Sequence, residues 1–440
     1  MQRVFLLLTY YFPPAPMGHA QRVAKLCKYL SLETHWIPHV ICGRLPYDIL
    51  PGQDQVLADE IPQIVKVKRV PSFIASDFAA TLRRWRIYKP VAVLRKLTVL
   101  PDAYGDWINR AVEAAEKEYP GGKGIACILA SGPPNSVYIA GLRLAQRWKL
   151  PLIIDMRDPW ERPAITWPTL TPWHRTRLRF MEKAVYKGAD VIIANTEGNA
   201  ADLKRRYPEL ENKIRVIPNG FDPEDLDPER GPRLREPGEP EDTIHFLYLG
   251  GIRGAIRGRA FEGDFLQAVA DYLSAHPDER PKIKIHFVGG TAAELESILG
   301  PYGLTDISRA YGVVASNDVG RPLYEADIYV LILPDLGPDQ GWIPAKLYYY
   351  LAGGKYIFAL IPNGSAKDLL LSVHAPAEYA SPRNRQEAVK ALGRIINRAR
   401  LNPRIATFNE LPAYALRFDR REIARQVGAV MDEVSSRGTK

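Results

Sequence analysis

Short runs of consecutive apolar residues recur along this chain, and each is followed by a stretch that can form a helix. A run that is apolar throughout, rather than alternating with polar residues, indicates a strand buried on both faces. Such strands, alternating with helices, predict a doubly wound α/β fold with parallel sheets. With an occasional polar residue inside, the strands that this pattern predicts cover residues 4–8, 125–130, 151–154, 191–194, 214–217, 244–249, 283–288, 328–333 and 356–360.

A polar stretch at residues 223–243 divides the chain into two halves of this kind. It is crowded with Pro, Glu, Asp and Arg, which is typical of a linker. Because 440 residues suffice for two domains with their own cores, we expect Rossmann-like domains over residues 1–222 and 244–411, with a cleft between them. Residues 412–435 read as a further helix.

The formal net charge of +9 and the sequence pI of about 9.2 suit anionic partners. Nucleotide phosphates, phospholipid headgroups and nucleic acid all stay open on this ground. Cys27, Cys42 and Cys127 have neither CxxC nor zinc-site spacing, so we interpret them as reduced thiols of a cytoplasmic protein. No apolar run reaches membrane-spanning length, so we expect any membrane contact to be peripheral.

Residues 83–96 carry six basic side chains among aromatic and aliphatic ones, and no acid lies between Phe78 and Leu100. Such a segment can lie on an anionic membrane surface, for example the inner face of the plasma membrane. A helical lid whose basic side faces water explains the composition equally well, and nucleic acid explains it less well. The six residues are Arg83, Arg84, Arg86, Lys89, Arg95 and Lys96.

A glycine- and arginine-rich loop follows the apolar run that ends at Leu249. Glycines allow a tight turn and close backbone approach, and arginines offer forked donors for phosphate oxygens. The spacing is neither GxGxxG nor that of a P-loop, so the loop favours a diphosphate ligand over a dinucleotide cofactor. A flexible surface loop is the less favoured alternative. The candidate ligand-binding residues are Gly250, Gly251, Arg253, Arg257 and Arg259.

A second candidate site lies at residues 341–355, between two apolar runs. A short helix there starts near Pro344 and stops at a Gly-Gly pair. Its start should lie at the carboxyl end of a parallel strand, where the helix dipole favours an anion. Lys346 lies in the first turns and can reach a phosphate, although for this segment alone an exposed lysine is the simpler interpretation.

Two further features carry weaker signals. Gly18 and His19 follow the first apolar run, although a lone histidine is more often structural than functional. Asp225 and Asp227 form a DxD pair, which holds a divalent metal in some enzymes, but no strand precedes it. We therefore predict no metal site.

In order and spacing, several short motifs resemble those of glycosyltransferase family 4, whose members have the GT-B fold and retain the anomeric configuration of the sugar. The resemblance covers nearly the whole chain. Its motifs are Tyr11-Phe12-Pro13-Pro14 with Gly18 and Arg22; Ser131-Gly132-Pro133-Pro134-Asn135-Ser136; Asp155-Met156-Arg157-Asp158-Pro159-Trp160; Ala189-Asp190-Val191-Ile192 with Asn195-Thr196; Ile217-Pro218-Asn219-Gly220-Phe221-Asp222; Ala326-Asp327-Ile328; and Ile343-Pro344-Ala345-Lys346-Leu347.

The resemblance implies that the N-terminal domain binds an acceptor, often a lipid-linked sugar or other glycan, and the C-terminal domain a UDP- or GDP-sugar. The last helix would cross back to the N-terminal domain. Arg253, with Arg257 or Arg259, would stabilise the leaving diphosphate without a metal or other cofactor. Gly18 would let the backbone approach the donor beside His19. Arg157, Asp158, Trp160 and Tyr138 would lie on the acceptor side.

Three positions depart from the family pattern. Gly341 and Tyr349 stand where the family has glutamates that hold the donor sugar and the ribose, and Tyr138 stands where some members have a histidine. A tyrosine hydroxyl supplies one weaker hydrogen bond in place of a bidentate anion. Two hypotheses therefore stay open: an active glycosyltransferase, and a non-catalytic relative that binds a sugar nucleotide, glycan or partner protein. A nucleotide-sugar epimerase fits the fold but not the order of the motifs.

We predict that Arg253→Ala weakens binding of a nucleoside diphosphate by about 1.5–3 kcal/mol, because it removes a charge-assisted hydrogen bond. Isothermal titration calorimetry with UDP and GDP measures the change. An unchanged dissociation constant would remove Arg253 from the site.

Overall fold

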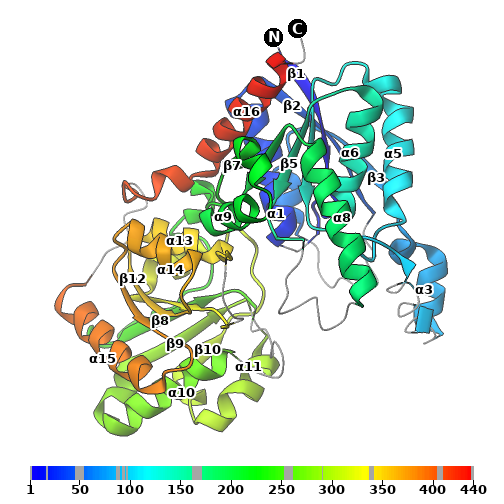
Figure 1. Cartoon of the computed structure of the whole chain (residues 1–440). Helices are drawn as coiled ribbons and strands as arrows, with labels where there is room; N and C mark the ends of the chain where they lie inside the picture. The colour runs from blue at the N-terminus through cyan, green and yellow to red at the C-terminus, as the bar shows by residue number, and fades with distance from the viewer. Residues whose placement is uncertain are drawn as a thin grey trace. The chain divides into compact units, whose positions relative to one another are not determined.

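The computed structural model describes residues 2–15, 18–44, 54–85, 90–91, 95, 98–160, 171–251, 261–289, 291–335, 341–403 and 410–437. The chain forms two compact units, coloured along the chain in Figure 1. Unit 1 comprises Met1–Asn219 with Arg420–Lys440, and unit 2 comprises Gly220–Asp419.

Unit 1 is built on a seven-stranded parallel sheet in the order β3-β2-β1-β4-β5-β6-β7. The chain direction across the sheet reverses between β1 and β4, so this unit has the doubly wound topology. Its strands are β1 (Arg3–Leu8), β2 (Trp36–Gly43), β3 (Lys66–Val70), β4 (Ile128–Gly132), β5 (Leu152–Met156), β6 (Val191–Ala194) and β7 (Ile214–Val216). Its helices are α1 (Gly18–Glu33), α2 (Gln55–Asp59), α3 (Asp77–Arg84), α5 (Trp107–Glu118), α6 (Ser136–Trp148), α8 (Pro172–Gly188), α9 (Glu197–Arg206) and α16 (Arg420–Arg437).

Unit 2 repeats the plan with a six-stranded parallel sheet in the order β10-β9-β8-β11-β12-β13. The reversal falls between β8 and β11. Its strands are β8 (Ile244–Leu249), β9 (Ile283–Val288), β10 (Ser308–Ala310), β11 (Ile328–Ile332), β12 (Tyr356–Leu360) and β13 (Ala377–Ala380). Its helices are α10 (Phe261–Ala275), α11 (Ala292–Leu299), α12 (Gly320–Glu325), α13 (Ala345–Gly353), α14 (Ser365–Ser372) and α15 (Arg385–Leu401).

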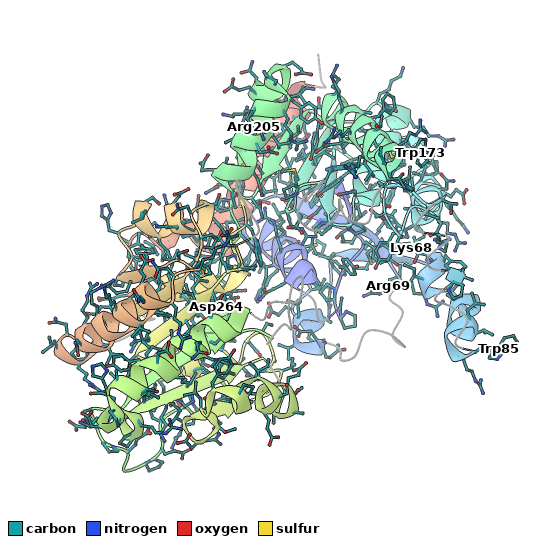
Figure 2. All side chains as sticks on the ribbon, turned by 60° about the horizontal axis from the view of Figure 1, so that its bottom comes forward. Lys68, Arg69, Trp85, Trp173, Arg205 and Asp264 are labelled. Atoms are coloured by element: carbon teal, nitrogen blue, oxygen red, sulfur yellow. The ribbon has the colours of Figure 1, made fainter. Side chains whose placement is uncertain are left out.

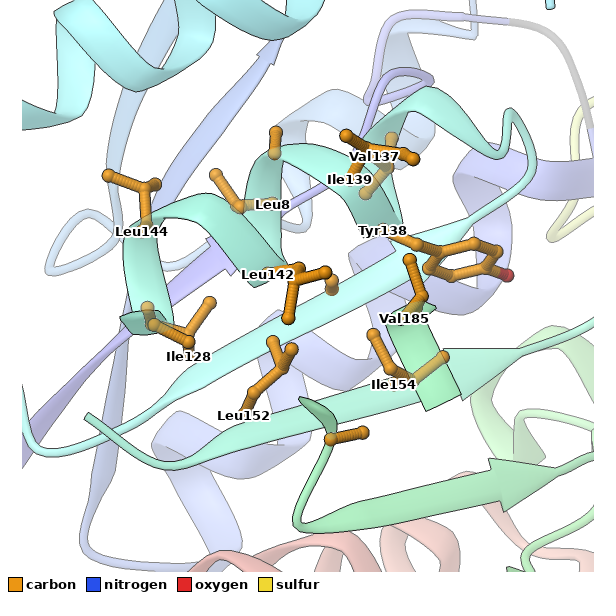
Figure 3. Close-up of a cluster of buried hydrophobic side chains, with 14 of the residues drawn as sticks. Leu8, Ile128, Val137, Tyr138, Ile139, Leu142, Leu144, Leu152, Ile154 and Val185 are labelled. Carbon is orange, nitrogen blue, oxygen red and sulfur yellow. The ribbon is translucent and has the colours of Figure 1, made fainter. Parts of the chain in front are cut away.

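Both faces of each sheet are buried, as the continuously apolar runs predict. In β1, Leu6 and Leu8 enter one core of unit 1, while Phe5 and Leu7 enter the other. Figure 3 shows part of the first core, where the apolar face of α6 covers β4 and β5. The predicted doubly wound α/β fold is therefore confirmed for both halves.

The last helix belongs to unit 1, although the preceding 200 residues form unit 2. Ile423, Val427 and Met431 of α16 lie in the second core of unit 1, and α16 packs against α1. The helix begins at Arg420 rather than at residue 412, because residues 412–418 form turns and a short 3-10 helix first.

Residues 223–243 are a packed part of unit 2, which corrects the prediction of a linker. Leu226 and Leu234 are each only 2% exposed and lie in its core. Arg235 Nη2 lies 2.7 Å from each of the two carboxylate oxygens of Asp327. The polar composition did not reveal these contacts, because composition shows neither which leucines are buried nor which charged residues pair.

Helix α5 begins at Trp107, and Asp102, which precedes it, serves another element. Asp102 accepts hydrogen bonds from the amide and hydroxyl of Ser136, at 2.8 and 2.6 Å, and so holds the start of α6. Its side chain is buried, and this desolvation raises the pKa of the carboxyl group, although the bonds from Ser136 oppose the rise.

Two buried histidines form a hydrogen-bonded chain across β8 and β9. His245 Nδ1 lies 2.9 Å from His286 Nε2, and His286 Nδ1 lies 2.9 Å from the Tyr311 hydroxyl. Burial lowers the pKa of His245 to about 2 and of His286 to about 3. The nearby charges of Arg235, Lys284 and Arg309 lower these pKa values further, and Glu239, 3.2 Å from His245 Nε2, does not reverse the shift.

We predict that unit 2 loses stability as the pH falls below about 6.5, the pKa of a histidine in the unfolded chain. Both histidines stay neutral in the fold while they gain protons on unfolding, so acid favours the unfolded state. The loss should be about 1 kcal/mol per pH unit for each histidine. Thermal or urea unfolding between about pH 7.5 and about pH 5 measures it.

The double variant His245→Gln/His286→Gln should flatten this pH dependence, while replacing the exposed His276 by Gln should leave it unchanged. An equally steep loss of stability in the double variant would contradict the assignment to these two side chains.

Candidate functional site

A buried ion pair lies at the carboxyl end of the unit 1 strands. Arg22 of α1 is 2% exposed, and its Nε and Nη2 donate to the Asp155 carboxylate at 3.2 and 2.9 Å. The Ser131 hydroxyl donates to the same carboxylate at 2.7 Å. Burial alone would raise the pKa of Asp155, but the charge and hydrogen bonds of Arg22 outweigh it, so the pKa lies below its usual value.

Three of the predicted acceptor-side residues meet around this pair. Arg157 Nε donates to the Gly132 carbonyl at 2.6 Å, and the Tyr138 hydroxyl donates to the Asp155 carbonyl at 3.2 Å. The Trp160 ring stacks on Tyr138 with centroids 5.9 Å apart. Burial lowers the pKa of Arg157 to about 10, so it is still protonated at neutral pH. Asp158 follows in the same loop and is half-buried.

Arg420 joins this region, and the sequence alone had not indicated it. It is the first residue of α16 and only 4% exposed, and its charge lowers the pKa of Arg157. Among the described residues, its Nε and Nη2 have no hydrogen-bond partner. Two buried guanidinium groups that repel each other would be stabilised by an anionic ligand. Only the return of the chain to unit 1 brings Arg420 here, so no local pattern could have revealed it.

Gly18 is the first residue of α1, and this helix follows β1, one of the two strands at the topological switch of unit 1. The prediction for Gly18 therefore agrees with a ligand-binding edge of the sheet. The side chain of His19 lies outside the described residues.

In unit 2, two glycines let the loops after β8 and β9 approach closely. Gly250 has φ +109° and its amide donates to the Val288 carbonyl at 2.7 Å. Gly289 has φ +122°, and a Cβ there would lie 2.7 Å from the carbonyl carbon of Gly250. Neither backbone position suits a residue with a side chain. Gly251 follows and is exposed. Arg253, Arg257 and Arg259 lie in residues 252–260, outside the described residues.

Lys346 of α13 reaches this glycine loop. Its Nζ lies 3.5 Å from the centroid of the Tyr248 ring and 3.5 Å from where a Cβ on Gly250 would be. Pro344 is the N-cap of α13 and leaves that helix start without a side-chain cap, and the half-buried Gly341 precedes it. The structure thus brings together Gly250, Pro344 and Lys346, where the loops after β8 and β11 flank the topological switch.

Tyr349 is 6% exposed, and its hydroxyl donates to Asp225 Oδ2 at 2.6 Å. Asp225 is fully buried, so the first carboxylate of the DxD pair serves the core of unit 2. The described part of the chain contains no cluster of His, Cys, Asp and Glu side chains that could hold a metal ion. Whether Tyr349 also contacts a ribose stays a prediction.

The neighbouring Tyr350 has a role that the sequence did not indicate. Its hydroxyl accepts a hydrogen bond from the Leu249 amide at 3.0 Å, which ties α13 to the residue before Gly250. This bond fixes the end of β8 relative to the helix that carries Lys346.

Residues 18–225 match the family model of Glycosyltransferase Family 4. A D-inositol 3-phosphate glycosyltransferase from Nocardiopsis dassonvillei is 28% identical over 269 residues, which are 57% of this chain and 60% of that relative. The aligned region thus spans less than two thirds of the relative's length. The predicted resemblance to family 4 is confirmed.

Solved structures share the fold over almost the whole chain. A sucrose-phosphate synthase from Thermosynechococcus elongatus superposes with a TM-score of 0.65 at 14% identity, covering 99% of this chain and 100% of that one. The Anabaena protein HepE in complex with UDP-glucose gives a TM-score of 0.60 at 14% identity, covering 97% and 99%. These likenesses concern the fold, and with the two parallel sheets they confirm the GT-B class.

We predict that Tyr349→Phe lowers the free energy of unfolding by about 1–3 kcal/mol, because the buried Asp225 carboxylate loses a donor. The affinity for a nucleoside diphosphate should stay unchanged. Urea unfolding and calorimetry measure the two effects, and Tyr302→Phe on the same unit is the control. If Tyr349→Phe instead weakens nucleotide binding and leaves the stability unchanged, the Tyr349 hydroxyl contacts the ribose.

Proposed function

We infer that this chain, whose residues 18–225 belong to glycosyltransferase family 4, transfers a sugar from a nucleotide-sugar donor to a glycan, glycolipid or polysaccharide acceptor. The family match carries the proposal. The geometry of unit 2 supports it, because Gly250 and Lys346 meet at the topological switch, where open α/β sheets bind ligands.

For the donor we propose a UDP- or GDP-sugar held by unit 2. Gly250 and Gly251 present backbone without side chains, against which a diphosphate would bind, and Lys346 supplies a cation there. Arg253 and Arg257, with Arg259, would neutralise the leaving diphosphate as its charge develops, without a metal and with retention of configuration. UDP-glucose is the first donor to test, since the Anabaena protein HepE was solved with it.

For the acceptor we propose a group with an anionic substituent, such as the phosphate of a lipid-linked sugar or of a sugar phosphate. Arg157 and Arg420 place two cations in a buried region of unit 1. The relative from Nocardiopsis dassonvillei is named for an acceptor with a phosphate, D-inositol 3-phosphate. Tyr138, Asp158 and Trp160 would line the same side, and His19 and Gly18 the reacting centre.

For the location we propose the cytoplasmic face of a membrane. Cys27, Cys42 and Cys127 are free and buried, and burial raises the pKa of all three thiols. Among the described helices, none has the length and apolarity needed to cross a bilayer. The proposed peripheral contact through residues 83–96 rests on their composition, and of these residues Arg84 and Trp85 are exposed.

The competing function is a non-catalytic relative that binds a sugar nucleotide, a glycan or a partner protein. Gly341 and Tyr349 favour it, because no carboxylate stands at either position and the Tyr349 hydroxyl bonds to Asp225. A sugar nucleotide could then bind through Gly250 and Lys346 without the groups that position the sugar for transfer.

We expect the purified chain to release UDP or GDP from one donor of a nucleotide-sugar panel, and the release to rise when membrane extract or sugar phosphates are added. A coupled assay for the nucleoside diphosphate measures it. Release should persist in EDTA, since the proposed stabilisation comes from arginines and lysine.

Lys346→Met should slow this release, while Lys390→Met, an exposed change on the same unit, serves as the control. If the chain binds a nucleotide but releases none from any donor, the transferase hypothesis is wrong and the non-catalytic binding protein is favoured.

A further inference from the structure

Helix α8 of unit 1 presents a solvent-facing side that the site above does not use. Its inner side is well anchored, because Leu178, Val185 and Tyr186 are buried against the sheet. Its outer side exposes two large aromatic residues, Trp173 at 56% and Phe180 at 70%. Figure 2 labels Trp173, and also Trp85 of the α3 region, among the side chains of unit 1.

The two aromatic rings lie on one stripe of the helix. They are seven residues apart, which is close to two turns of an α-helix, so both point to the same side. The exposed Arg177 lies between them, one turn after Trp173. A stripe of large aromatic side chains on a surface helix is costly in water and indicates a surface that is covered in use.

The exposed charges that α8 itself carries are all positive. The exposed basic residues of α8 are Arg177, Arg179, Lys183 and Lys187. Its only acid, Glu182, is fully buried and accepts hydrogen bonds from Arg206 Nη1 and the Tyr207 hydroxyl, at 2.7 and 2.9 Å. Glu209, which lies outside the helix, is 4.0 Å from Lys183. The outer side of α8 therefore combines two exposed aromatic rings with exposed cations.

The segment at residues 83–96 has less free charge than its composition suggests. Arg95 Nη2 lies 2.6 Å from Asp106 Oδ1, and its guanidinium lies 4.1 Å from the centre of the Phe73 ring. Arg95 is therefore bound within unit 1. Arg84 and Trp85 are exposed, Trp85 to 68%, and could add to a surface contact that another part of unit 1 makes.

We propose that the outer side of α8, centred on Trp173, Arg177 and Phe180, docks unit 1 onto an anionic lipid bilayer. Tryptophan and phenylalanine are favourable at the boundary between headgroups and acyl chains, and lysine and arginine beside them pair with anionic headgroups. A duplex nucleic acid would need the cations but would leave the two aromatic rings in water. This proposal rests on the proposed function. It adds the surface through which unit 1 would reach a membrane-associated acceptor.

The test measures vesicle binding of the full chain without donor or acceptor, so that its outcome is separate from that of sugar transfer. Sedimentation compares vesicles of phosphatidylcholine with vesicles that contain about one third phosphatidylglycerol. We expect binding to the anionic vesicles only, weakened by salt.

The double variant Trp173→Ala/Phe180→Ala should lower the partition coefficient at least about tenfold, because two interfacial anchors are lost. Arg177→Gln/Lys187→Gln should lower it on anionic vesicles as well. Since these side chains are exposed, the thermal midpoint should stay unchanged. The matched control is Val313→Ala/Leu401→Ala in unit 2, where both side chains are 79% exposed, and it should bind like the parent chain.

Three results would overturn the proposal. The first is equal binding of the parent chain and the aromatic double variant. The second is absence of vesicle binding together with binding of a single-stranded oligonucleotide that the double variant loses, which would assign the surface to nucleic acid. The third is a concentration-dependent dimer that the double variant abolishes while vesicle binding is absent, which would assign it to a second copy of the chain.

Discussion

The ion pair between Arg22 and Asp155 organises the ligand-binding edge of unit 1. Through it, α1 is bound to the end of β5. The Ser131 hydroxyl of β4 donates to the same carboxylate, so the end of β4 is held there as well. Arg22 Nη1 also donates to the Pro218 carbonyl at 2.7 Å, just before the chain leaves the unit. Four separate segments thus meet at this ion pair. Removing either charge would leave the other buried and uncompensated, which costs about 3–5 kcal/mol.

The same pair sets the charge that a ligand would meet. Asp155 is bound to Arg22, and its charge also raises the pKa of Arg157, while the charges of Arg22 and Arg420 lower that pKa. Arg157 is positioned through its Nε bond to the carbonyl of Gly132, the last residue of β4. The edge of unit 1 is therefore both rigid and cationic, the combination that suits recognition of an anionic acceptor.

The order of strands and helices could be predicted from the sequence because it depends on local apolar patterns. The contacts that shape the candidate site could not, because they join distant residues: Arg22 and Asp155 are 133 positions apart, and Tyr349 and Asp225 are 124. Motif spacing assigned Tyr349 to a family position, but the direction of its hydroxyl depends on a buried carboxylate from the segment read as a linker. Arg420 is equally remote, since only the return of α16 to unit 1 places it beside Arg157.

Three consecutive tyrosines on α13 show how the donor side differs from the family pattern. Tyr348 packs on Phe418, Tyr349 bonds to Asp225, and Tyr350 receives the Leu249 amide. All three side chains thus stabilise unit 2, and Tyr350 holds α13 against the end of β8. Lys346 lies one turn before Tyr350 and beside Gly250, on a helix that these contacts hold in place. A cation held in this way can stabilise a diphosphate with little reorganisation, even though neither Gly341 nor Tyr349 supplies a carboxylate.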